Sequence, residues 1–342
     1  MRKPSRILIF DVNWLGDVLF STPVIRNIRY NFPNSFIACV IPSRCFQVLE
    51  GNPYLDEIIF FDERNQQRSL KEKLKFINLI KAKRFDMAFL LHRSFTRAFI
   101  LWLAGIKERV GYATKKRAFL LTKKIPHPDR DSLHRIDYYL GVIKGAGLKV
   151  IDKHLDFFIS KEDFIFVDNF LKENKITETD LLVGINPFGN WLPKRWPVNY
   201  WKELIQKITE QIPSKIIITG GKDDLSLAQD IKTNNPSVII TCGKLNLKQF
   251  GALCKRLNLF ISADTGPLHI ANTVGTKKII ALFGPTSLIT TSPYPIDNVI
   301  ILKKDVGCKI PCYVVNCNDN RCMKAITPEE VLKEIKRIAY SG

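Results

Sequence analysis

The feature that most constrains the fold of this chain is an alternation of short, largely apolar segments with stretches of helical periodicity, present in both halves. The apolar runs stand at residues 7–10, 36–41, 58–61 and 87–91, and again at 181–185, 215–219, 238–241, 259–262 and 278–283. Short apolar runs of this kind are typical of strands buried on both faces, and helices between them favour βαβ units. The sequence therefore predicts an α/β fold with two Rossmann-like, doubly wound parallel-sheet domains that face each other across a cleft.

The 342 residues are enough for two such domains. We expect the first domain at residues 1–160, a linker region at 161–180 and the second domain at 181–326. Residues 327–342 begin with Thr-Pro-Glu-Glu, which is a typical helix start because threonine caps, proline fits the first turn and acids favour the positive helix end. We expect this C-terminal helix to pack back toward the first domain.

A polar turn, Asp264-Thr265-Gly266-Pro267, directly follows one of the second-half strands. Ligands of open α/β sheets bind outside the carboxyl ends of the strands, and a helix N-terminus there attracts anions. Asp264 is suited to accept hydrogen bonds from sugar hydroxyls, and Thr265 and Gly266 to donate to phosphate. His269 is either a ligand contact or a hydrogen-bonded packing residue. Lys194 follows another strand of this half, where its charge would clamp a diphosphate.

Two further strand ends carry candidate residues. Asp17 lies after the first apolar run, where aspartate is either a helix N-cap or a carboxylate placed to deprotonate an attacking hydroxyl. Gly220 and Gly221 follow the run at 215–219, where a glycine pair permits close backbone approach to a ligand or merely serves the geometry of the turn. No G-x-G-x-x-G accompanies the first turn, which disfavours a dinucleotide-dependent dehydrogenase.

The charge of the chain points to an anionic partner. Lysine and arginine number 52 against 33 acidic residues, a formal net charge of +19. Nucleic acid, a membrane surface or a phosphorylated substrate would match this excess, and a lysine-rich solvated surface would also produce it. The excess is densest at residues 92–124, where nine residues are basic and only Glu108 is acidic.

Four of the eight cysteines are clustered near the C-terminus. Their roles stay open among a structural zinc site, two disulfides and reduced thiols, although the spacing matches no standard zinc ribbon; the four are Cys308, Cys312, Cys317 and Cys322. No apolar run approaches the roughly 20 residues that span a bilayer, and the N-terminal region lacks a secretory pattern. We therefore expect a cytoplasmic protein, in which stable disulfides are disfavoured.

The motifs together closely resemble glycosyltransferase family 9, the ADP-heptose:lipopolysaccharide heptosyltransferases, and especially its heptosyltransferase II-like members. The resemblance covers nearly the whole chain, with the matching motifs in the expected order. They are LGDVL at 15–19, STPVIR at 21–26, HRSF at 92–95, RVGY at 109–112 with LLT at 120–122, KRWP at 194–197, DTGPLH at 264–269 and FGPT at 283–286, followed by RCM at 321–323 and ITP at 326–328.

This resemblance implies a GT-B fold with an acceptor-binding first domain and a sugar-nucleotide-binding second domain. It implies inverting transfer of heptose from ADP-heptose to the lipopolysaccharide inner core, without a required cofactor, by a peripheral enzyme on the cytoplasmic face of the inner membrane. Asp17 takes the role of general base. Lys194 and the 264–269 motif, His269 included, take the role of donor-binding residues, with Gly220 and Gly221 as additional candidates.

The basic stretch would then bind the phosphorylated lipid A-core acceptor and the anionic membrane surface. The acceptor-binding candidates in it are Arg93, Arg97, Arg109, Lys115, Lys116 and Arg117.

The sequence also departs from the family pattern. Asn13 and Trp14 precede Gly16 where basic or small residues are usual, Phe188 replaces a common glycine, and Ala263 a frequent asparagine. These differences leave open a related family 9 transferase that uses another nucleotide sugar or acceptor. A basic nucleic-acid-binding protein is the alternative from another class, but the basic stretch has no helix-turn-helix, zinc-finger or RNA-binding pattern.

Overall fold

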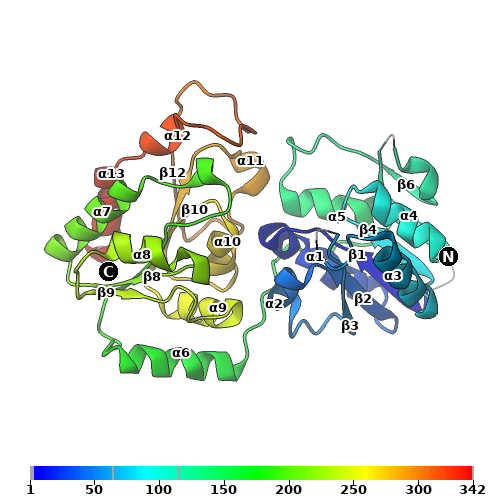
Figure 1. Cartoon of the computed structure of the whole chain (residues 1–342), viewed down its shortest axis with the longest axis horizontal. Coiled ribbons are helices and arrows are strands. Elements are labelled where there is room, and N and C mark those ends of the chain that lie inside the picture. Colours follow the sequence, from blue (N-terminus) through cyan, green and yellow to red (C-terminus); the bar gives the residue numbers. More distant parts are fainter. Residues whose placement is uncertain (1–3, 64, 115, 341–342) are drawn as a thin grey trace. The chain divides into compact units, whose positions relative to one another are not determined.

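The computed structural model describes residues 4–63, 65–114 and 116–340. The chain divides into two compact units, Met1–Phe158 and Ile159–Gly342 (Figure 1). Each unit is built around its own six-stranded sheet, in which every strand pairing is parallel. The predicted α/β class with two doubly wound sheets is therefore confirmed.

The sheet of the first unit has the strand order β3-β2-β1-β4-β5-β6. This order places the first strand at the centre and reverses direction between β1 and β4, as in dinucleotide-binding folds. The strands are β1 (Arg6–Phe10), β2 (Phe36–Ile41), β3 (Glu57–Phe60), β4 (Met87–Leu90), β5 (Glu108–Ala113) and β6 (Lys123–Pro126).

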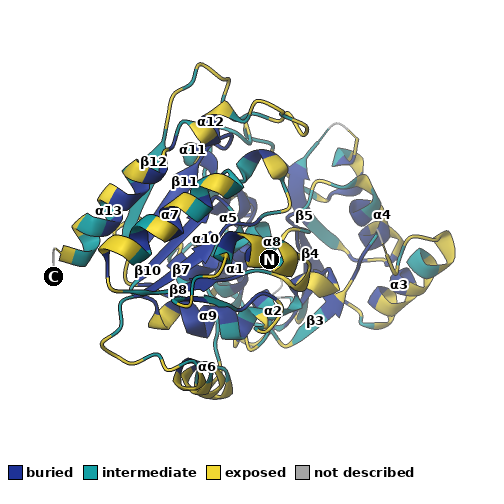
Figure 2. Ribbon diagram, turned by 60° about the vertical axis from the view of Figure 1, so that its left-hand side comes forward, coloured by how far each residue is buried: buried dark blue, intermediate teal, exposed yellow. Residues whose placement is uncertain are grey.

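Helices cover both faces of this sheet, so the central strands are buried throughout (Figure 2). Alternate residues of β1 point to opposite faces. Leu8 and Phe10 pack with the apolar sides of α3 and α4, whereas α5 contacts β4, β5 and β6 and packs against α1. The helices of the unit are α1 (Leu15–Asn31), α2 (Phe46–Leu49), α3 (Leu70–Ala82), α4 (Phe95–Leu103) and α5 (Arg135–Gly145).

The second sheet repeats the same winding in the order β12-β11-β10-β7-β8-β9, with β7 and β10 as the central neighbours. Residue by residue, Leu259 of β10 pairs with Val183 of β7, and Phe260 of β10 with Ile279 of β11. The strands are β7 (Leu182–Asn186), β8 (Lys215–Ile218), β9 (Val238–Ile240), β10 (Leu259–Ala263), β11 (Ile279–Phe283) and β12 (Val299–Lys303).

Two helices of the second unit differ from our expectations. The expected linker contains α6, whose first turn is closed by a capping box between Ser160 and Asp163, and which packs against α9. The expected C-terminal helix forms as α13, but it packs on α7, and its buried side chains belong to the core of the second unit rather than the first. The helices are α6 (Lys161–Glu173), α7 (Val198–Gln211), α8 (Leu225–Lys232), α9 (Leu247–Arg256), α10 (Gly266–Thr273), α11 (Leu288–Thr291), α12 (Arg321–Lys324) and α13 (Pro328–Tyr340).

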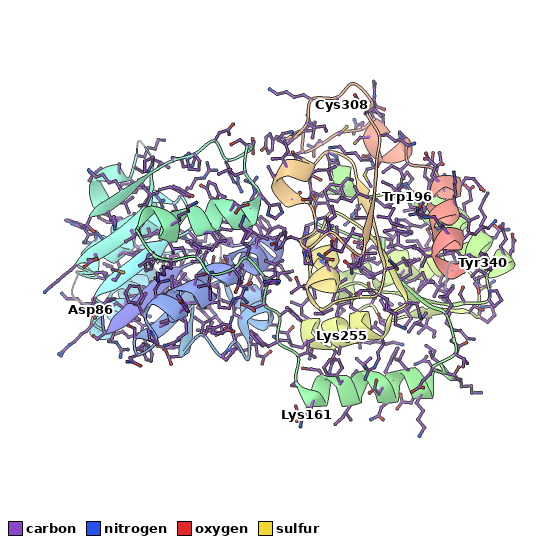
Figure 3. All side chains as sticks on the ribbon, turned by 180° about the vertical axis from the view of Figure 1, so that it is seen from behind. Asp86, Lys161, Trp196, Lys255, Cys308 and Tyr340 are labelled. Carbon is purple, nitrogen blue, oxygen red and sulfur yellow. The ribbon has the colours of Figure 1, made fainter. Side chains whose placement is uncertain are left out.

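A buried tryptophan joins the C-terminal segment to this core. Trp196, labelled in Figure 3, is 2 % exposed, and its indole Nε1 donates a hydrogen bond of 2.8 Å to the carbonyl of Ile326. The ring also meets Trp201 edge to face at 4.9 Å. In the part of the chain that is described, no helix is long and apolar enough to cross a membrane.

Candidate active site

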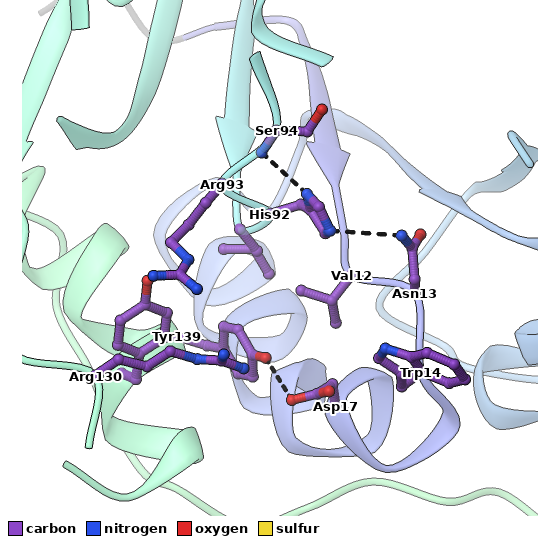
Figure 4. Close-up of a pocket in the computed structure, with 11 residues that line it drawn as sticks. Val12, Asn13, Trp14, Asp17, His92, Arg93, Ser94, Arg130 and Tyr139 are labelled. Carbon is purple, nitrogen blue, oxygen red and sulfur yellow. Dashed lines mark hydrogen bonds between the residues drawn. The ribbon is translucent and has the colours of Figure 1, made fainter. Parts of the chain in front are cut away.

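A cavity of about 430 Å³ opens in the first unit where β1 and β4 end (Figure 4). These neighbouring strands flank the point at which the strand order reverses, which is where open α/β sheets bind their ligands. Residues that follow β1 and β4 line the cavity, joined by residues on and before α5. They are Val12, Asn13, Trp14, Asp17, Leu91, His92, Arg93, Ser94, Arg130, Tyr138 and Tyr139.

Asp17 lines this cavity from the first turn of α1 and is not the N-cap of that helix. The N-cap position belongs to Trp14, whose side chain makes no capping hydrogen bond. The carboxylate of Asp17 instead accepts a hydrogen bond of 2.7 Å at Oδ1 from the hydroxyl of Tyr139 on α5 (Figure 4). Burial and the charge of Asp17 raise the pKa of Tyr139 well above its ordinary value, so this hydroxyl remains a donor.

Two charged groups support the loop between β1 and α1: Arg97, which the sequence analysis assigned to acceptor binding, and Asp11, which it did not select. Arg97 of α4 is 2 % exposed and donates to the backbone carbonyl of Asp11 and to the side-chain oxygen of Asn13. Asp11 is completely buried and accepts 2.7 Å hydrogen bonds from the amide of Val12 and the hydroxyl of Ser21. A carboxyl group directly after the apolar run at 7–10 was the available signal.

Burial raises the pKa of Asp11 from 3.8 to about 7, although these hydrogen bonds and Arg97 act in the opposite direction. The carboxyl therefore changes protonation near neutral pH while remaining inaccessible to a ligand.

His92 contributes a neutral imidazole to the cavity. Its Nδ1 accepts a hydrogen bond of 3.0 Å from the amide of Ser94, and its Nε2 lies 3.4 Å from the side-chain nitrogen of Asn13 (Figure 4). Burial and nearby arginines lower the pKa of His92 from 6.5 to about 3. The ring is thus uncharged at neutral pH, and acceptance at Nδ1 places its proton on Nε2.

The structure divides the predicted acceptor-binding cations into two groups. Arg93 is exposed and lines the cavity, together with Arg130, which the sequence analysis did not select. Lys116 is also exposed, and Lys115 lies outside the described residues.

The guanidinium groups of the other three cations donate hydrogen bonds to backbone carbonyls of the same unit. Arg97 supports the β1–α1 loop, Arg109 donates to the carbonyls of Leu120 and Ile106, and Arg117 donates to those of Tyr112 and His92. Because these interactions hold backbone in place, we no longer assign Arg97, Arg109 or Arg117 to ligand binding.

In the second unit, the residues predicted at the strand ends of β7 and β10 meet. Lys194, at the end of a short turn after β7, donates from Nζ to the backbone carbonyl of Asp264 at 2.7 Å and to its Oδ2 at 3.0 Å. His269 of α10 lies 3.0 Å from Oδ1 through its Nε2, and the hydroxyl of Thr291 donates to Oδ2 at 3.0 Å.

This arrangement stabilises a buried charge. Asp264 is 2 % exposed. Burial raises the pKa of Asp264, but Lys194 and His269 together lower it more, so that the pKa lies well below its ordinary value. The carboxylate is therefore ionised, and both of its oxygens already accept hydrogen bonds. We had expected Asp264 to accept hydrogen bonds from sugar hydroxyls, but this arrangement suits it to orient Lys194 and His269.

The remaining donor-site candidates differ in accessibility. Thr265 is the N-cap residue of α10 and, like Gly266, is partly exposed, so this helix end remains accessible. A Cβ on Gly220 would lie 2.7 Å from the ring of Phe188, and the amide of Gly221 already donates to Asp224 at 2.8 Å. Packing and turn geometry thus account for both glycines without a ligand.

The four clustered cysteines do not form a metal site. Cys308 lies on an exposed loop (Figure 3), Cys312 and Cys317 are partly exposed, and Cys322 is buried beside Gly284. Across the described ranges, no three His, Cys, Asp or Glu side chains gather as metal ligands would. All four thiols are free. The zinc candidate from the sequence is therefore not supported.

Comparison with known proteins gives a consistent result. The sequence model of glycosyltransferase family 9 (heptosyltransferase) matches residues 73–320. Lipooligosaccharide heptosyltransferase 2 of Campylobacter jejuni (strain 81116) is 26 % identical over 350 residues, an alignment that covers 98 % of this chain and 99 % of that protein. These matches confirm the resemblance inferred from the motifs.

Solved structures agree with this result. The family 9 glycosyl transferase of Veillonella parvula superimposes with a TM-score of 0.88 and 26 % identity, covering 99 % of this chain and 98 % of that one. The ADP-heptose lipopolysaccharide heptosyltransferase II of Escherichia coli gives a TM-score of 0.79 at 20 % identity, over 98 % and 99 % of the two chains. The fold predicted from the resemblance is the fold of these proteins.

Proposed function

Since this chain belongs to glycosyltransferase family 9, we propose that it transfers heptose from ADP-heptose to the inner core of lipopolysaccharide. The donor is supported by the Escherichia coli structure, which is described as an ADP-heptose heptosyltransferase, and the acceptor class by the relative in Campylobacter jejuni. Family membership also argues against the nucleic-acid-binding alternative.

The observation that carries the proposal is the carboxylate of Asp17 in the cavity of the first unit. Tyr139 occupies one oxygen of this carboxylate and leaves the other for a substrate hydroxyl. Asp17 acts as general base on the attacking hydroxyl of the acceptor. A new bond forms between that oxygen and the anomeric carbon, the bond from this carbon to the diphosphate breaks, and ADP leaves with inversion of configuration.

The rest of the cavity suits a phosphorylated sugar acceptor. Arg93 and Arg130 supply cations that pair with acceptor phosphates, since guanidinium groups bind such oxyanions in a bidentate manner. His92 presents an uncharged imidazole to the cavity, beside the side-chain amide of Asn13. The acceptor hydroxyl is then held near Asp17 by groups that do not compete for its proton.

The leaving diphosphate is stabilised in the second unit. An ammonium group has three N–H donors, and the two contacts of Lys194 with Asp264 leave the third for a phosphate oxygen. The accessible N-terminus of α10 at Thr265 and Gly266 adds backbone donors to the same anion. Asp264 positions Lys194, and His269 contacts the other oxygen of the same carboxylate. Stabilising the leaving group in this way lowers the barrier to transfer.

The proposed acceptor is lipid-linked, which places the enzyme at the cytoplasmic face of the inner membrane as a peripheral protein. The anionic surface there matches the net charge of +19.

The test is transfer from ADP-heptose to a heptose-deficient inner-core acceptor by purified protein and its Asp17→Asn variant. Turnover by the variant should fall by roughly 10²–10⁴, while ADP affinity measured by calorimetry stays unchanged. Asp297→Asn is the matched control, because Asp297 is exposed and remote in sequence from every proposed site residue. Retention of full turnover by Asp17→Asn would exclude Asp17 as the base. Parallel reactions with UDP- and GDP-sugars identify a different donor if ADP-heptose is inert.

A further inference from the structure

Four aromatic side chains form a continuous exposed strip on the first unit. Phe95, Phe99 and Trp102 lie at spacings of four and three along α4, which places them on one face of the helix. They are 43 %, 38 % and 49 % exposed, and Phe119, on the turn before β6, is 71 % exposed. We call these four residues the aromatic strip.

The rings of the strip contact one another. Phe95 and Phe99 stack at 5.8 Å, Phe99 and Trp102 at 5.6 Å, and Phe119 approaches Phe95 at 6.3 Å. The opposite side of α4, with Ala98 and Leu101, is buried in the unit's own core. The helix therefore has both a buried and an exposed side (Figure 2), and its exposed side carries the three aromatic rings. Clustered exposed aromatic rings of this kind mark a binding surface.

Exposed cations flank the strip. Arg93 stands two residues before Phe95, Lys107 follows α4, and Lys116 precedes Phe119, and all three are exposed. Between residues 93 and 107 the sequence contains no acidic residue. Aromatic rings flanked by cations are typical of surfaces that rest on a bilayer, where the rings reach the acyl boundary and the cations meet lipid phosphates.

The strip also begins at the cavity. Arg93 and Ser94 line the cavity, and Phe95 is the first residue of α4. A lipid-linked acceptor whose chains remain in the bilayer would therefore enter the cavity from the end of the strip.

We propose that the aromatic strip docks the enzyme on the surface of a bilayer containing anionic lipids, and thereby presents the acceptor's sugar to Asp17. This inference rests on the proposed function for its purpose, but the binding itself does not depend on catalysis. The rings lie at the level of the headgroups, and Arg93, Lys107 and Lys116 pair with phosphates.

The test is cosedimentation of the full chain with phosphatidylethanolamine–phosphatidylglycerol vesicles, without donor or acceptor. The double variant Phe99→Ala, Trp102→Ala should bind the vesicles at least roughly tenfold more weakly than the wild type, because it removes two apolar contacts with the bilayer. Ile165→Ala, Phe166→Ala is the matched control, since these two apolar residues are exposed on α6 in the other unit. Phe119→Ala, on a separate turn, repeats the test independently of the helix.

The charged part of the interaction is tested separately. Lys107→Gln, Lys116→Gln should weaken binding to anionic vesicles at low salt, with little effect on neutral phosphatidylcholine vesicles. Wild-type vesicle binding by both the Phe99, Trp102 variant and the Phe119 variant would overturn the proposal. Light scattering that shows a dimer lost in the double variant would also overturn it, because the strip would then bind a second copy.

Activity assays separate this inference from the proposed function. The double variant should keep its turnover on an acceptor stripped of acyl chains and lose turnover on the same acceptor presented in vesicles. If the wild type binds vesicles through the strip but transfers no heptose, only the proposed function fails.

Discussion

Replacement of Asp11 by asparagine should make the protein more stable at alkaline pH and flatten the dependence of its stability on pH. Asp11 is completely buried, and its carboxyl accepts from the Val12 amide and contacts the Ser21 hydroxyl. The Ser21 hydroxyl also lies 2.8 Å from the carbonyl of Val18, to which it can donate. A protonated Asp11 can donate to Ser21 while Ser21 donates to Val18, and an asparagine amide can do the same without carrying charge.

The magnitude follows from the pKa of Asp11, which burial raises from 3.8 to about 7. Between these two values the folded state keeps a proton that the unfolded chain has lost, so stability falls as pH rises. The pKa of Asp11 is shifted by about three units, each worth 1.36 kcal/mol. The ionised carboxylate therefore lowers the free energy of unfolding by about 4 kcal/mol above pH 7. From pH 5 to pH 8 the Asp11 contribution changes by about 3 kcal/mol.

The assay is urea unfolding of the wild type and Asp11→Asn at pH 5 and pH 8, followed by circular dichroism. The loss of stability between the two pH values should be smaller in the variant by about 3 kcal/mol, because all other titrating groups are shared. Ser21→Ala serves as a control that removes the hydrogen-bond partner and retains the carboxyl. Equal pH dependence in wild type and Asp11→Asn would refute the assignment of a raised pKa to Asp11.

Two further predictions concern the ionic cluster of the second unit. Lys194→Met should weaken ADP binding in calorimetry. It should also lower the free energy of unfolding by about 3–5 kcal/mol, because it leaves the buried Asp264 carboxylate without its main partner. The control Lys202→Met removes an exposed ion pair with Asp230 and should change neither quantity. Asp264→Asn should destabilise the protein at pH 7 and progressively less as pH falls below 4. The lowered pKa of Asp264 contributes its full stability above the pKa of the unfolded chain and loses it as pH falls toward the pKa of the folded state; a cost that is constant from pH 7 to pH 3 contradicts that lowered pKa.

The buried strands were predictable because their signal is local. The apolar run at 36–41 coincides with β2, and the run at 259–262 is one residue shorter than β10. Such segments are buried on both faces, so nearly every residue contributes to the pattern. By contrast, α6 was assigned to a linker because only a narrow stripe of it is buried, chiefly Val167 and Leu171. A narrow stripe gives weak periodicity, and its partner α9 lies far along the chain.

The roles of the arginines were not predictable, because a guanidinium group reaches backbone that is distant in sequence. Arg97 meets the carbonyl of Asp11, a residue 86 positions earlier, and Arg117 meets that of His92. From the charge density of the sequence alone, such a residue is expected to lie exposed on the surface. Only the folded chain shows that the basic stretch at 92–124 divides between cations that hold the cavity's loops and cations that stay free to meet a ligand.

Asp11 and Asp17 show most clearly what the fold adds to the sequence. Both are aspartates near the end of β1, six positions apart, and either is a candidate base by residue type alone. Asp11 has the pKa near neutrality that favours proton transfer, yet it is sealed beneath the loop with Val12 and Ser21 occupying its oxygens. Asp17 lines the cavity, with Tyr139 on one oxygen. Since a base must reach the proton that it removes, access outweighs pKa, and the general base in our proposal is Asp17.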